Sequence, residues 1–183
     1  MKTLLHICCA PCSIECIDAL RGEGGELTGF WFNPNIHPVT EYRARLEALK
    51  GYAAQIDLPL LGLDRYGLKD FVKAVSSDLD NRCGVCYEMR LGEAAGFAAA
   101  NGFEAFTTTL LISPYQNHEL LLETGRRVAR AHGVEFLERD FRPHFREGQK
   151  RARELELYMQ KYCGCVFSEE ERYRPKPSEL GQA

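Results

Sequence analysis

The chain has 183 residues, of which 27% are charged and 45% are hydrophobic, and its formal net charge is −3. This composition is typical of a globular protein and excludes a largely disordered chain. No apolar run approaches the ~20 residues that a membrane span requires, and the slightly negative charge means that any RNA-binding surface must be local.

The predicted elements alternate between strand and helix along the chain. Residues 3–8 are typical of a strand buried on both faces; because this apolar run is short and leads directly into a helical pattern, we assign it to the fold rather than to a signal peptide. The other expected strands cover residues 26–32, 57–64, 103–111 and 134–141. The expected helices cover residues 12–25, 37–56, 68–76, 83–102, 114–133 and 147–162, before a turn and a polar tail from about residue 172 that we expect to be flexible.

Strands that alternate with helices pair in parallel, so the sequence predicts an α/β fold: a single domain over residues 1–183 with a doubly wound parallel sheet flanked by helices. Ligands of such sheets bind at the carboxyl ends of the strands. Polar and sulfur groups fall there: Cys8, Cys9, Asn33, Asp64, Thr109 to Ser113, and Asp140. This edge is therefore the expected site.

The chain contains eight cysteines, and without a signal peptide or a membrane span we expect a cytoplasmic protein. In that reduced compartment, clustered cysteines more often bind metal or act in catalysis than form disulfides. Cys8 and Cys9 end the first strand, where the turn before Pro11 lets neighbouring side chains reach one ion. The alternative is that they are small buried core residues.

Cys83 and Cys86 form a C-x-x-C pair at a predicted helix start, where residues three apart share a face. Alone, the pair could be a redox pair, half of a zinc site, or without function. Together with Cys8 and Cys9 it favours a four-thiolate site, which suits zinc or an iron–sulfur cluster.

Cys163 and Cys165 flank Gly164 and could close into a reducible disulfide, bind metal as further ligands, or remain spare thiols. Cys12 could face the site from the first helix. Cys16 lies one turn further along that helix, so we expect it to have a packing role.

Several stretches match one family, in order and over nearly the whole chain, and together they are far more specific than any one alone. They are "LLHICCAPCS", "FWFNPNIHPVTEYRAR", "NRCGVCYEMRL", "FTTTLLISPYQ", "RDFRP" and "YCGCVFSE". The chain thus resembles the QueH-type epoxyqueuosine reductases. The resemblance implies reduction of epoxyqueuosine to queuosine at the wobble position of tRNA, and a sheet related to the HUP group of nucleotide-binding folds. Because "CCAPCS" stands where nucleotide-dependent members of that group have a Ser-Gly-Gly loop, we do not expect ATP use.

The resemblance also implies site residues. Cys8, Cys9, Cys83 and Cys86 would bind a [4Fe-4S] cluster, and Cys163 and Cys165 would be the redox-active pair. A second iron or zinc ion would lie beside the cluster and share some of its cysteine ligands; Cys12, which stands near the Ala-Pro turn where some members have an aspartate, is a further candidate ligand for it.

Reducing an epoxide to an alkene requires two electrons, two protons and an external electron donor. Asp64, Tyr115 and Asp140 are candidate proton donors by position, although an aspartate would need a raised pKa to donate at neutral pH, and the favoured alternative for each is a structural role. Ser113 and Gln116, in the "SPYQ" stretch that also reads as a helix cap, are candidate substrate contacts.

A tRNA substrate requires a surface that binds phosphates. Residues 139–153 interleave basic and aromatic side chains, as in proteins that bind single-stranded loops, so Arg142, Arg146 and Lys150 are candidate contacts. The alternative is a solvated helix face. Two other functions stay open: a zinc-stabilised RNA-binding module without catalysis, and a tRNA sulfur transferase that uses Cys163 and Cys165.

Overall fold

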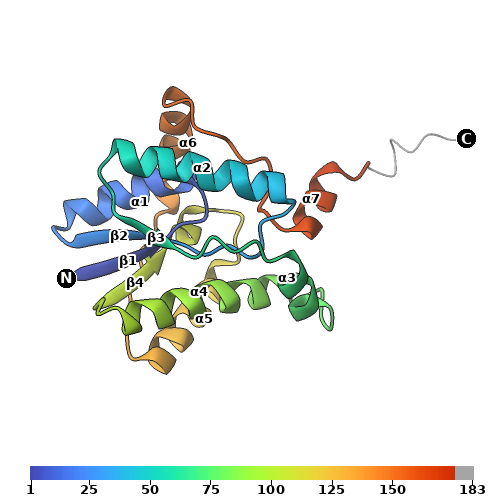
Figure 1. Ribbon diagram of the computed structural model, residues 1–183, viewed down its shortest axis with the longest axis horizontal. Helices are drawn as coiled ribbons and strands as arrows, with labels where there is room; N and C mark the ends of the chain where they lie inside the picture. The colour runs from blue at the N-terminus through green and yellow to red at the C-terminus, as the bar shows by residue number, and fades with distance from the viewer. Residues whose placement is uncertain (176–183) are drawn as a thin grey trace, which may run out of the picture.

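The computed structural model describes residues 1–175 as a five-stranded parallel sheet between two layers of helices (Figure 1). The strands are β1 (Lys2–His6), β2 (Glu26–Trp31), β3 (Leu60–Gly62), β4 (Ala105–Thr108) and β5 (Glu135–Phe136). The helices are α1 (Ala10–Gly22), α2 (Val39–Gln55), α3 (Leu68–Val75), α4 (Arg82–Ala100), α5 (His118–His132), α6 (Phe145–Glu154) and α7 (Val166–Tyr173). Two short 3-10 helices cover Thr109–Ile112 and Arg142–His144. The predicted fold class is confirmed.

The strand order is β3-β2-β1-β4-β5. Strands β2 and β3 are therefore added on one side of β1, and β4 and β5 on the other side. Helices α1, α2 and α6 cover one face of the sheet, and α4 and α5 cover the other (Figure 1). The side on which strands are added changes between β1 and the parallel strand β4, where His6 and Thr108 are paired in register. Ligands of open parallel sheets bind outside such a point, at the carboxyl ends of the strands.

The core consists of apolar strand residues packed against the apolar faces of the helices. Leu4, Leu5, Phe30 and Phe106 are completely buried in the three central strands, as expected for strands covered on both faces. Among residues 1–175, none of the helices combines the length and the apolar character that crossing a membrane would require.

The structure differs from the predicted elements mainly at their ends. The strand predicted over residues 103–111 stops at Thr108, because its hydroxyl accepts a hydrogen bond from the Leu110 amide (3.2 Å) and starts a 3-10 turn. Ser113 does not cap the next helix. That helix begins at His118, where the Asn117 side chain accepts the Leu120 amide at 3.1 Å.

The C-terminal region differs more. The last predicted helix, residues 147–162, is shorter in the structure: α6 ends at Glu154, and residues 155–165 form an irregular segment. The sequence did not predict α7, which covers part of the region expected to be a flexible tail. The rest of that expected tail, from residue 176, lies outside the described residues.

Candidate functional site

Three buried thiols meet where β1 passes into α1. The sulfur atoms of Cys8, Cys9 and Cys12 all lie within 4.8 Å of one another, and those of Cys8 and Cys9 are 3.7 Å apart. Cys9 is the N-cap residue of α1 with an extended backbone, and Pro11 occupies the first turn. The strand end and the first helical turn therefore direct consecutive and i+3 side chains to one place. We call Cys8, Cys9 and Cys12 the thiol triad.

The surroundings of the thiol triad favour loss of the proton from one of its three thiols, that of Cys8. Hydrogen bonds from Cys12 and Cys9, with help from the positive charge of Arg90, hold the pKa of Cys8 well below its usual value. The pKa of Cys12 is raised by the same interaction with Cys8, and burial raises the pKa of Cys9. Thiolates are the form that binds metals, so the triad is predisposed to bind a cation.

Neutral side chains also donate to these sulfurs. The Thr109 hydroxyl lies 3.4 Å from the Cys8 sulfur and also accepts the Cys8 amide at 3.1 Å. The Gln160 Nε2 lies 2.9 Å from the Cys9 sulfur and 3.3 Å from that of Cys12. Thr109 comes from the end of β4 and Gln160 from the segment after α6, so the triad is enclosed by distant parts of the chain.

The other site cysteines form a second set. Cys83 and Cys86 lie in the first two turns of α4, and burial raises the pKa of both thiols, that of Cys86 to about 12. Cys86 and Cys165 pack in the same apolar cluster, and Cys163 is exposed. The Cys165 sulfur accepts the Ser168 amide at the start of α7 at 3.4 Å. Among residues 1–175, the sulfurs that lie within 4.8 Å of one another are those of the triad. The four predicted cluster ligands instead comprise two triad residues, Cys8 and Cys9, and two residues of the second set, Cys83 and Cys86.

Arg90 connects the two sets. It is completely buried on α4, its guanidinium lies 3.8 Å from the Cys86 sulfur, and its charge also acts on Cys8. It donates to the Asn33 side chain at 2.8 Å, while its Nε has no hydrogen-bond partner among the described residues. It pairs with no carboxylate in residues 1–175. A buried guanidinium requires a counter-ion, and among residues 1–175 the Cys8 thiol is the group beside Arg90 whose pKa is lowered toward the anionic form.

A second buried arginine holds the segment that carries Cys163. Arg45 on α2 is 2% exposed and pairs with Glu41 at 2.7 Å. Its remaining nitrogens donate to the main-chain oxygens of Tyr162 (2.9 Å) and Cys163 (3.0 Å). The Tyr158 hydroxyl donates to the other oxygen of Glu41. Residues 158–163 are therefore tied to α2, although this segment has no regular secondary structure of its own.

A cavity of about 600 Å³ opens onto these groups. Cys8, Cys12 and Cys163 contribute to its lining, so both sulfur sets reach the same space. Such a volume lies within the range of small-molecule sites. The remaining lining residues come from α2, the 3-10 turn after β4, the loop between that turn and α5, α6 and the segment after α6: Arg45, Thr109, Leu110, Ser113, Tyr115, Gln116, Phe145, Arg146, Gln149, Arg153, Gln160, Lys161 and Tyr162.

The candidate proton donors fall in different places. Tyr115 lines the cavity, whereas Asp64 lies outside it and accepts from Tyr42 (3.1 Å) and Arg43 (3.2 Å). Asp140 is also outside the lining, and hydrogen bonds from Arg142 lower its pKa to about 2. This shift is opposite to the one that a proton donor at neutral pH needs.

The candidate substrate contacts also separate. Ser113, Gln116 and Arg146 line the cavity, and Gln116 donates to the Cys163 sulfur at 3.4 Å. Arg142 and Lys150 do not line it; both form ion pairs elsewhere.

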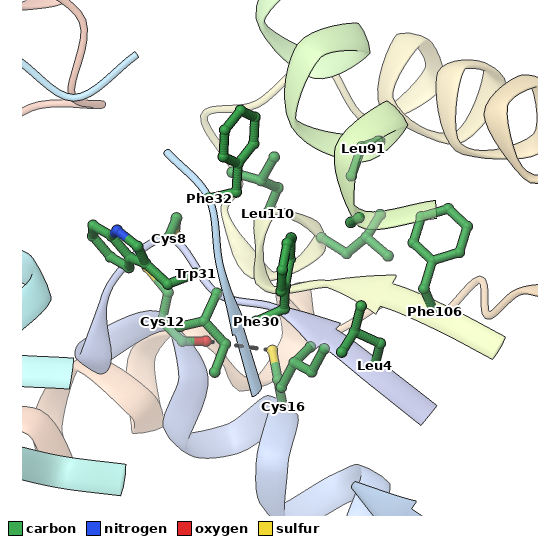
Figure 2. Close-up of a cluster of buried hydrophobic side chains, with 14 of the residues drawn as sticks. Leu4, Cys8, Cys12, Cys16, Phe30, Trp31, Phe32, Leu91, Phe106 and Leu110 are labelled. Carbon is green, nitrogen blue, oxygen red and sulfur yellow. Dashed lines mark hydrogen bonds between the residues drawn. The ribbon is translucent and has the colours of Figure 1, made fainter. Parts of the chain in front are cut away.

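Cys16 has the packing role that we expected. Its thiol is completely buried and donates to the Cys12 carbonyl at 3.3 Å, the dashed line in Figure 2.

The sequence analysis did not single out Arg45, Arg90 or Gln160. A local signal existed for the two arginines: Arg45 follows Glu41 by four residues, and Arg90 follows Cys86 by four, so each lies one turn from a partner on the same helical face. Nothing local marks Gln160, because its contacts with the triad are almost 150 residues away in the chain.

Comparison with known proteins identifies the family of this chain. A family model described as "Epoxyqueuosine reductase QueH" matches residues 3–171. A protein of that name from Dehalococcoides mccartyi is 38% identical over 172 residues, which are 94% of this chain and 94% of the relative. Relatives of the same name from Acinetobacter baylyi and Thermotoga maritima are 37% and 35% identical, covering 91% and 98% of this chain and 80% and 95% of their own lengths. The chain therefore belongs to the epoxyqueuosine reductase QueH family.

Proposed function

We propose that this chain is an epoxyqueuosine reductase, which reduces the epoxide of epoxyqueuosine in the anticodon loop of tRNA to give queuosine, with electrons from an external donor. Membership of the family supports the reaction. The observation that carries the proposal to this site is the cavity into which Cys8, Cys12 and Cys163 all open. An open cavity lined by several thiols at one sheet edge suits a reductive reaction on a bound nucleoside better than it suits a closed structural zinc site.

The residues present fit an iron–sulfur cluster. Cys8 and Cys9 would bind it from the end of β1, and Cys83 and Cys86 from the start of α4, while Cys12 is a candidate ligand of a second iron or zinc ion beside it. Arg90 supports this assignment, because its buried charge lies against Cys86 and acts on Cys8 without a carboxylate partner among residues 1–175. When bound, a cluster would supply electrons one at a time.

The overall reaction breaks both C–O bonds of the epoxide, forms a C=C bond and releases the oxygen as water, which consumes two electrons and two protons. The Cys163 and Cys165 thiols can account for both: as they close to a disulfide they release two electrons and two protons, and the external donor then restores the thiols. Cys163 is exposed to the cavity, and its sulfur accepts a hydrogen bond from Gln116, which would hold the sulfur toward a bound substrate.

The neighbouring side chains would position the nucleoside. The Tyr87 hydroxyl donates to Oε1 of Gln116 at 2.7 Å, so the Gln116 amide is held with its Nε2 toward Cys163. Ser113 and Tyr115 lie on the same side of the cavity and offer hydroxyl groups to the substrate. Of the three candidate proton donors only Tyr115 lies at the cavity, so we assign to it the transfer of one of these two protons to the epoxide oxygen, after which a thiol proton restores its hydroxyl.

The test combines metal content with turnover. The protein is purified without oxygen, iron, zinc and acid-labile sulfide are measured, and RNA that carries epoxyqueuosine is incubated with protein and dithionite before its nucleosides are identified by mass spectrometry. We expect about four irons and four sulfides per chain and conversion to queuosine. Cys83→Ser should lower both metal content and conversion, whereas Cys163→Ser should lower conversion alone. Cys16→Ala is the matched control, because this buried thiol belongs to the packing of α1.

Three results would contradict the proposal. Stoichiometric zinc without sulfide, even after reconstitution with iron and sulfide, would favour the zinc-stabilised binding module. Sulfur incorporated into the RNA would favour the sulfur transferase. Full conversion by Cys163→Ser would remove the dithiol from the reaction.

A further inference from the structure

The cavity that the thiols line is rich in positively charged side chains, unlike the protein as a whole. Its lining contains four cations, Arg45, Arg146, Arg153 and Lys161, and no aspartate or glutamate among residues 1–175. The whole chain has a formal net charge of −3. Apart from the thiols, the charged side chains of residues 1–175 in its lining are all cationic, and such charges raise the local concentration of anions although the protein as a whole does not attract them.

Three of these cations are also free of ion pairs. Arg146, Arg153 and Lys161 are exposed at the cavity, and none forms a salt bridge within the part of the chain that the structure describes. Most other exposed cations among residues 1–175 are paired, and so are the basic residues beside these three in sequence: Arg142 with Asp140, Lys150 with Glu147 and Glu154, and the half-buried Arg151 with Glu15 and Asp18. Cations that are paired within the protein are less available to a phosphate.

An exposed aromatic ring completes the entrance. Tyr115 is 85% exposed, and its ring meets the edge of Phe145 with the centroids 5.9 Å apart and the planes at 82°. The contact holds one edge of the ring, so much of its surface faces solvent beside the cavity. A large aromatic side chain exposed at a cationic cavity is typical of sites where nucleic acid bases stack.

We propose that Arg146, Arg153, Lys161 and Tyr115, here called the rim, bind the single-stranded loop of the RNA. The three cations bind phosphates on either side of the target nucleoside, and Tyr115 stacks on a base while that nucleoside enters the cavity toward the thiols. This inference rests on the proposed function and refines its substrate surface: the long basic segment 139–153 divides into rim residues and residues that stabilise the fold. It also gives Tyr115 a binding role besides proton transfer.

The test measures binding rather than turnover. The probe is a synthetic RNA hairpin with the sequence of the anticodon arm and an unmodified guanosine at the wobble position, titrated with anaerobically purified full-length protein at several salt concentrations. The variants are Arg146→Gln, Arg153→Gln, Lys161→Gln and Tyr115→Ala. All four side chains are exposed, so we expect wild-type unfolding temperatures and metal content. The controls are Lys150→Gln on the same helix, which is ion-paired, and Arg130→Gln on α5, which is exposed and lies outside the cavity lining.

We expect each rim cation variant to bind about 10-fold more weakly and to flatten the slope of log affinity against log salt by about 0.7. Tyr115→Ala should weaken binding about 5- to 100-fold with the salt slope unchanged. The controls should bind as the wild type does. Equal loss in the rim variants and the controls would mean a diffuse electrostatic surface and would overturn the proposal, as would rim variants that bind normally or a wild type that does not bind the hairpin. Failure of the proposed function would differ from these outcomes, since RNA would then bind at the rim without any conversion of epoxyqueuosine.

Discussion

Replacing Arg45 with methionine tests whether this buried arginine holds the Cys163 segment in place. Methionine has a similar length but cannot donate hydrogen bonds, so Arg45→Met removes the ion pair to Glu41 and the bonds to the Tyr162 and Cys163 carbonyls. Because Cys163 is exposed, we expect its carbonyl to turn toward water in the variant. Most of the loss of unfolding free energy should therefore come from the Glu41 carboxylate, which loses its ion pair.

The size of the effect follows from the burial of Glu41. This carboxylate is 8% exposed, and in the variant only the Tyr158 hydroxyl would still donate to it. Removing one partner of a buried ion pair costs ~3–5 kcal/mol. At ~2–4 °C per kcal/mol for a domain of this size, Tm should fall by ~6–20 °C. Adding Glu41→Gln should recover part of the loss, because the variant then no longer buries an unpaired carboxylate.

The assay is urea unfolding of the metal-free protein under reducing conditions, together with hydrogen exchange of residues 160–165. We expect lower unfolding free energy and faster exchange in this segment, with little change in β1. A loss of no more than ~0.5 kcal/mol, the range of ordinary surface substitutions, would refute the reasoning. So would unchanged exchange at residues 160–165, or a double variant less stable than Arg45→Met alone.

Three further changes should have distinct effects. Gly125→Ala should lower the unfolding free energy by ~1–3 kcal/mol, measured by urea unfolding, because a Cβ atom would lie 2.3 Å from the Phe136 ring. Burial lowers the pKa of His37 from its usual 6.5, so the unfolded chain binds a proton that the folded chain resists and stability falls as the pH drops below 6.5. The His37 Nδ1 accepts the Val166 amide (3.2 Å), so its protonation should also speed hydrogen exchange at the start of α7, after correction for the intrinsic rate. Arg90→Met should lower the retention of iron and sulfide, because this buried charge lies 3.8 Å from the Cys86 sulfur and lowers the pKa of Cys8.

Each expectation has an outcome that contradicts it. A wild-type unfolding midpoint for Gly125→Ala would mean that the Phe136 ring moves aside without cost. An NMR titration that places the pKa of His37 at or above its usual value would contradict the inferred pH dependence. Normal iron and sulfide in Arg90→Met would show that this charge does not balance the thiolates.

The order of strands and helices could be predicted from the sequence because the signals are local. Apolar runs such as residues 3–8 and the helical spacing of residues 37–56 depend on neighbours within a few positions, so the α/β class and the parallel sheet follow from them. The position of the site at the carboxyl ends of β1 and β4 also follows, since it depends on topology. The missed boundaries lie where competing caps act, as at Thr108 and Asn117.

The chemistry inside the site required the tertiary structure. The sequence shows eight cysteines, but not that the sulfurs of Cys8, Cys9 and Cys12 lie within 4.8 Å of one another, nor that Arg90 connects them with Cys86. Long-range contacts decide such matters, because burial and hydrogen bonding depend on residues from other segments. Arginine is normally exposed, so the partners four residues before Arg45 and Arg90 indicate a contact on one helical face but not the burial of either side chain.

The basic segment 139–153 shows the same division most clearly. Its composition predicts positive charge on this part of the surface, and the structure agrees. Which cations remain available to a substrate depends on where carboxylates from other elements lie. Arg151 is paired because Glu15 and Asp18 on α1 reach it, whereas Arg146 faces a cavity whose lining contains no carboxylate from the described residues, 1–175. The sequence determined the composition of the segment, and the packing of α6 against α1 decided which of its charges face the cavity.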